Sequence, residues 1–96
     1  LQDTIPLIRH HQERWNGTGY PGGLIGEKIP ILARMFSIVD AFDALTSKRP
    51  YRQKKMTTRE ALEYLREQTG ILFDPQIVDV FEKLVTESQP DLLTTE

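Results

Sequence analysis

The 96-residue sequence contains no cysteine, one tryptophan and no apolar run near the ~20 residues of a membrane-spanning helix. Without cysteine, a disulfide scaffold, a thiol nucleophile and a Cys-ligated zinc site are excluded, and a cytoplasmic location is favoured. No signal peptide opens the sequence, and no window alternates apolar and polar residues as a strand would. Because the first residue is Leu1 rather than methionine, we expect a segment of a longer chain.

The composition is that of an ordinary folded domain, with 39% hydrophobic and 27% charged residues and a net charge of −2. The charge is uneven, because residues 1–56 carry nine Lys/Arg and five Asp/Glu whereas residues 57–96 carry three and nine. The basic first half could face an anionic ligand, or it could be an ordinary uneven surface.

Apolar periodicity and capping residues predict an all-α fold, a helical bundle of about four helices. The expected helices cover residues 3–11, 30–47, 57–70 and 74–88. A loop with five glycines separates the first two. Thr57 and Glu60 have the spacing of a capping box, and Asp74 precedes Pro75 at the start of the last helix. The second helix is apolar nearly all round, which is typical of a buried element.

Two acidic residues interrupt this apolar helix. Asp40 and Asp43 are three residues apart and therefore share a face. A carboxylate in low-dielectric surroundings needs a metal, hydrogen bonds or an ion-pair partner. The pair could therefore do metal or catalytic work, or form a salt bridge with Arg34 or Arg49.

Other chemistry-bearing residues flank that helix. His10 and His11 could bind a metal from the edge of a pocket, or be exposed near a helix C-terminus. Tyr20, in the glycine-rich loop, could stack on a base or anchor the loop. Arg49 and Arg52 lie in a basic cluster that could hold phosphate or be a solvated patch. No helix-turn-helix pattern with a basic recognition helix supports duplex DNA binding.

Together these motifs resemble the second half of an HD-GYP domain, whose bacterial members are metal-dependent phosphodiesterases that hydrolyse cyclic diguanylate. The resemblance covers roughly residues 5–85 and implies that residues 1–88 form the C-terminal part of such a domain, with 89–96 a frayed tail. The matching segments are HQERWNGTGYP at 11–21, IPILAR at 29–34, DAFDALTS at 40–47, RPYR at 49–52 and FDP at 73–75.

The resemblance also implies roles for individual positions. His11 and Asp40 match metal ligands, and Asp43 matches an acidic residue of the same pocket, where we expect a catalytic role. The implied cofactor is a divalent transition metal, iron or manganese. Tyr20 matches the tyrosine of the naming tripeptide, in a loop that could also bind a partner signalling domain. The arginines of the RPYR segment, Arg49 and Arg52, match positions that hold the phosphates of cyclic di-GMP.

Two departures from the family pattern affect the metal site. The pattern reads His-His-Glu, two residues, then Asp-Gly, whereas this sequence has Gln12 at the second histidine and Asn16 at the aspartate. A one-residue slip would instead let His10 and His11 serve as the histidine pair. The family's His-Asp dyad lies upstream of the region matching Leu1. We therefore expect the 96-residue chain alone not to hydrolyse a phosphodiester.

Three functions stay open at this point. The parent protein is a cyclic di-GMP phosphodiesterase, a silent HD-GYP-like module that senses nucleotide or binds a partner domain, or an HD phosphohydrolase acting on another phosphoester. In each case, apolar surface left uncovered on the helix over 30–47 would favour a homodimer.

Overall fold

The computed structural model describes residues 10–48, 50 and 54–89 and confirms the all-α prediction. It contains a 3₁₀ turn, η1 (Gly26–Lys28), and three α-helices, α2 (Ile31–Thr46), α3 (Thr58–Glu67) and α4 (Pro75–Ser88). About four helices were expected, and the first of them falls outside the described residues except at its end. Within the described part, none of the helices is long and apolar enough to cross a membrane.

The starts of α3 and α4 are determined by local hydrogen bonds, as predicted. Thr57 Oγ1 accepts from the Glu60 N–H at 3.1 Å, while the Glu60 side chain accepts from the Thr57 N–H at 2.9 Å. This reciprocal pair is a capping box. Asp74 Oδ1 accepts from the Gln76 N–H at 2.8 Å to cap α4. At α2 the structure differs slightly, because Pro30 is the cap rather than the first helical residue.

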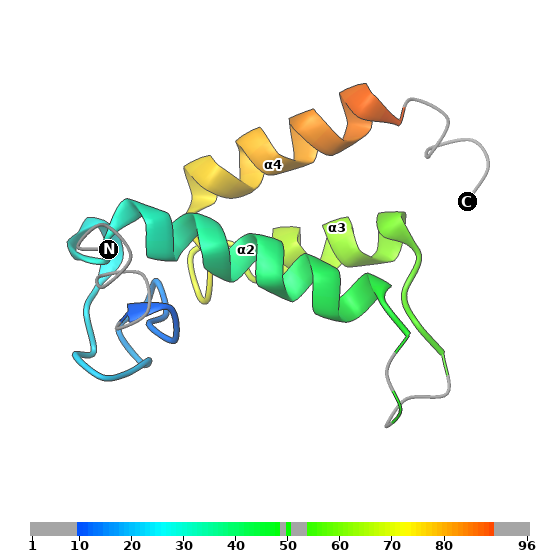
Figure 1. Cartoon of the computed structure of the whole chain (residues 1–96). Helices are drawn as coiled ribbons and strands as arrows, with labels where there is room; N and C mark the ends of the chain where they lie inside the picture. Colours follow the sequence, from blue (N-terminus) through cyan, green and yellow to red (C-terminus); the bar gives the residue numbers. More distant parts are fainter. Residues whose placement is uncertain (1–9, 49, 51–53, 90–96) are drawn as a thin grey trace.

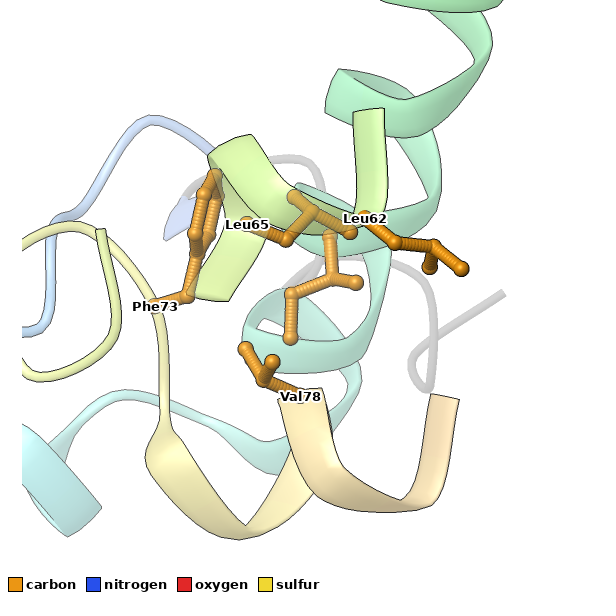
Figure 2. Close-up of a cluster of buried hydrophobic side chains, with 5 residues drawn as sticks. Leu62, Leu65, Phe73 and Val78 are labelled. Atoms are coloured by element: carbon orange, nitrogen blue, oxygen red, sulfur yellow. The ribbon is translucent and has the colours of Figure 1, made fainter. Parts of the chain in front are cut away.

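The hydrophobic core lies where the three helices meet. α2 contacts both α3 and α4, and these two contact each other (Figure 1). Figure 2 shows the cluster of buried side chains, which comprises Ile38, Leu62, Leu65, Phe73 and Val78. The rings of Phe42 and Phe81 meet edge to face beside it, with centroids 5.1 Å apart. The packing of side chains from α3 and α4 against α2 thus holds α2 in place.

One side of α2 is nevertheless exposed. Only Ala33 and Ile38 of this helix are buried, so α2 is less buried than its apolar sequence alone suggests, and the described chain shows the expected uncovered apolar surface. α3 and α4 cover one face, whereas among the described residues the other face is covered only in part, where the His11 ring packs against Phe36. The exposed large side chains of α2 are Ile31, Leu32, Met35, Phe36 and Val39.

A buried ion pair connects the start of α2 to the start of α4. Arg34 Nη1 donates to Asp74 Oδ2 at 2.7 Å, and Arg34 Nε donates to the Ile29 carbonyl at 2.9 Å. Arg34 therefore pairs with a residue 40 positions away, and the suggested salt bridge from Arg34 to the acidic pair on α2 is wrong. The other suggested partner, Arg49, lies outside the described residues.

Candidate functional site

A surface cleft of about 140 Å³ lies where the segment before the glycine-rich loop meets α2 and the residues before α4. Two backbone hydrogen bonds hold this segment in place, from Trp15 N–H to the Leu72 carbonyl at 3.1 Å and from Asn16 N–H to the Ile71 carbonyl at 2.9 Å. Figure 1 shows the segment beside the N-terminal part of α2. The cleft is lined by His11, Gln12, Glu13, Arg14, Ser37, Asp40, Ala41, Leu72 and Phe73.

His11 and Asp40 line this cleft from different elements. The His11 ring packs edge-on against Phe36, with centroids 5.9 Å apart, while Asp40 projects from α2 into solvent. Imidazole and carboxylate are suitable donors for a divalent transition metal. No cluster of three or more potential ligands occurs among residues 10–48, 50 and 54–89. His11 and Asp40 can therefore supply two ligands of a metal site, and further ligands would have to come from outside the described residues.

Gln12 and His10 differ in their relation to the cleft. Gln12 lines it, and its Nε2 lies 3.2 Å from His11 Nε2. Since an amide NH₂ only donates, this hydrogen bond requires an unprotonated His11 Nε2, the same lone pair that a metal would use. His10 is absent from the lining, and its Nδ1 lies 3.2 Å from Glu13 Oε2. Because His11 lines the cleft and His10 does not, this geometry favours the alignment with the family motif that has no one-residue slip.

Asp43 does not line the cleft with Asp40. Its Oδ1 accepts from the Ser47 Oγ at 3.2 Å, at the C-terminal end of α2. Both aspartates are exposed, so the expected low-dielectric surroundings of the pair are wrong for the described residues. The cause is the uncovered face of α2, because partial coverage leaves both carboxylates in water.

The predicted substrate-binding residues are only partly described. Tyr20 is 65% exposed, so the interpretation that its ring anchors the loop in the core is wrong. Its exposed ring is free to stack on a planar ligand. Arg49 and Arg52 lie outside the described residues, and their roles stay predictions.

Glu13 is a functional candidate that sequence reasoning missed. Its buried carboxylate accepts from the Gly22 N–H at 2.7 Å and from the Leu24 N–H at 2.9 Å. Burial acts to raise the pKa of Glu13, but the hydrogen bonds from Gly22 and His10 outweigh it, and the pKa is lowered. The available signal was an acidic residue close to a glycine-rich loop, whose N–H groups lack helix or sheet partners.

The sequence model of the HD domain matches residues 1–77. The chain belongs to the HD domain family. This HD domain is 54% identical over 72 residues to the cyclic di-GMP phosphodiesterase response regulator RpfG of Xanthomonas campestris. It is 49% identical over 81 residues to the cyclic di-GMP phosphodiesterase PA4108 of Pseudomonas aeruginosa. The aligned parts make up 75% and 84% of this chain but only 18% and 19% of those relatives.

A solved structure shows the same arrangement. The crystal structure of a cyclic GMP-AMP-specific phosphodiesterase of Vibrio cholerae (V-cGAP3) superposes with a TM-score of 0.73 at 32% identity. The match covers 93% of this HD domain and 19% of that chain. The predicted HD-superfamily membership is confirmed, and HD-domain phosphodiesterases imply a divalent metal cofactor. The HD domain spans about a fifth of the length of these relatives.

One departure from the family pattern is explained by the loop. Asn16 stands where the pattern has aspartate, and its Oδ1 accepts from Thr18 N–H at 3.1 Å and from Thr18 Oγ1 at 2.7 Å. This local turn needs a short side chain with an oxygen acceptor, which asparagine supplies as well as aspartate. The substitution therefore preserves the start of the loop.

Proposed function

We propose that this HD domain is part of a bacterial, cytoplasmic, metal-dependent phosphodiesterase that hydrolyses cyclic di-GMP in signal transduction. The observation that carries the proposal is the shared cleft of His11 and Asp40. These two metal-ligand types come from separate elements of a chain about half identical to named cyclic di-GMP phosphodiesterases.

His11 and Asp40 would hold a divalent metal, with iron or manganese the expected ion. Two donors do not complete a catalytic site, so the remaining ligands would come from chain outside these 96 residues. The bound ion would lower the pKa of a water molecule and neutralise charge on the phosphate. Gln12 contributes a neutral amide where an imidazole would bind more tightly, so we expect a second metal site to be weak.

The other residues would act on the nucleotide. Tyr20 presents an exposed ring on which a base can stack. Arg49 and Arg52 would hold the phosphates by charge-assisted hydrogen bonds. Asp43 lies one helical turn beyond Asp40, where a carboxylate can exchange a proton with bound substrate.

A catalytically silent module is the second candidate, and Gln12 is the observation that favours it. An amide in a ligand position weakens the metal site, while Tyr20 stays exposed and able to contact nucleotide or a partner signalling domain. A third candidate retains the metal but acts on another phosphoester.

Turnover by the full-length protein tests these functions. The protein would be loaded with iron or manganese and assayed with cyclic di-GMP, 3'3'-cGAMP and bis(p-nitrophenyl) phosphate. Hydrolysis of cyclic di-GMP ahead of the other two substrates is expected. Hydrolysis of bis(p-nitrophenyl) phosphate alone would favour the third candidate. Nucleotide binding without turnover would favour the silent module.

A further inference from the structure

Glu13 is a buried acidic residue in the lining of the cleft, and the proposed reaction assigns it no role. Its two carboxylate oxygens take different loop partners: Oε2 accepts from the Gly22 N–H at 2.7 Å and Oε1 from the Leu24 N–H at 2.9 Å. His10 Nδ1 also lies 3.2 Å from Oε2. Gly22 and Leu24 both belong to the far side of the glycine-rich loop. The carboxylate therefore replaces the backbone partners that these N–H groups lack in an irregular segment.

A second contact holds the near side of the same loop. Gly19 lies so close to the preceding segment that an added Cβ would come within 2.4 Å of the Gln12 carbonyl and 2.5 Å of the Arg14 nitrogen. The Tyr20 N–H also points to the Gln12 carbonyl, at 3.4 Å. Only glycine permits this approach, so the loop is attached to residues 12–14 on both sides of Tyr20.

These attachments determine where Tyr20 lies. Its ring is 65% exposed, so packing of the side chain contributes little to its position. The backbone on either side is instead held by residues directly following His11. One short segment thus carries a candidate metal ligand and the attachment points of the loop that presents the aromatic ring.

We propose that Glu13 is a positioning residue that holds Tyr20 at a defined place relative to His11, so that the base and the phosphate of a cyclic dinucleotide are engaged together. This inference rests on the proposed function. Glu13 itself touches neither the metal nor the substrate and acts through the loop. The two-oxygen carboxylate is essential, because a glutamine offers one oxygen and turns an NH₂ group toward a second N–H donor.

The loop attachment is tested by amide hydrogen exchange in the full-length protein. In Glu13→Gln, exchange of one of the two amides, Gly22 or Leu24, should rise about tenfold, because glutamine keeps only one of the two acceptor oxygens. Glu27→Gln is the matched control: it is the same substitution at an exposed residue just after the loop, and exchange should stay unchanged. Equal exchange in wild type and Glu13→Gln would overturn the attachment. If Glu13→Gln does not fold, exchange is measured in Glu13→Asp instead. Aspartate keeps the charge, but its side chain is one methylene shorter and cannot reach the loop N–H groups in the same way.

The positioning role is tested by a double-mutant cycle on hydrolysis of cyclic di-GMP. Glu13→Gln should raise KM about tenfold with bound metal unchanged, but should have almost no effect on KM in a Tyr20→Ala background. An equal rise in both backgrounds, or loss of metal in Glu13→Gln, would show that Glu13 does not act through Tyr20. A wild-type protein without turnover would overturn the proposed function and the role in substrate binding, while the exchange experiment would still decide the loop attachment.

Discussion

Replacing Asp74 by alanine removes two interactions at the start of α4. The carboxylate caps the Gln76 N–H at 2.8 Å and pairs with Arg34 at 2.7 Å, where the two side chains are 3% and 14% exposed. A helix cap contributes about 1 kcal/mol, and breaking a buried ion pair from one side costs about 3–5 kcal/mol. Arg34 keeps its hydrogen bond to the Ile29 carbonyl, so we expect the free energy of unfolding to fall by about 3–5 kcal/mol.

Urea unfolding of Asp74→Ala measures this loss, and Asp79→Ala is the matched control. Asp79 pairs with Arg66 at the same 2.7 Å, but those side chains are 66% and 44% exposed. A solvated pair of this kind contributes at most about 1 kcal/mol, because water and salt screen it. If the two variants lost equal stability, the reasoning that burial determines the cost would be refuted.

The remaining predictions concern the metal, the substrate and self-association. Gln12→His should raise metal occupancy and hydrolysis together, as measured by metal analysis and turnover. If His10 and His11 are instead the metal-binding pair, His10→Ala would lower the amount of bound metal, and Gln12→His would leave metal occupancy and hydrolysis unchanged. Arg49→Ala or Arg52→Ala should weaken cyclic di-GMP binding by about 1.5–3 kcal/mol at constant metal content, whereas unchanged affinity would indicate a solvated patch. The 96-residue chain should form dimers through the exposed face of α2, and sedimentation as a monomer at high concentration would contradict this.

The helix starts could be predicted because their causes are local. The capping box at Thr57 and the cap at Asp74 involve hydrogen bonds between residues two or three positions apart, which a sequence pattern contains completely. The partner of Arg34 could not be predicted in the same way. Asp74 is 40 residues away, and only the packing of α2 against α4 brings the two together.

That His11 and Asp40 lie near each other was predictable from the family motif but not from spacing alone. His11 and Asp40 line one cleft, yet they are 29 positions apart, and the resemblance was needed to associate them. Exposure of Asp40 was missed because helical periodicity identifies an apolar helix without showing which of its faces a neighbour covers. Glu13 was missed because its acceptor role depends on how the loop folds back over it.

The metal content of the full-length protein, measured for four variants, tests the site most directly. His11→Ala and Asp40→Ala should each lose metal, because each removes a donor from the shared cleft. Asp43→Ala changes the same residue type one turn further along α2, outside the cleft lining, and should retain metal while losing turnover. Glu27→Ala provides a surface control. Unchanged metal in both His11→Ala and Asp40→Ala would contradict the assignment and leave the silent module as the better account.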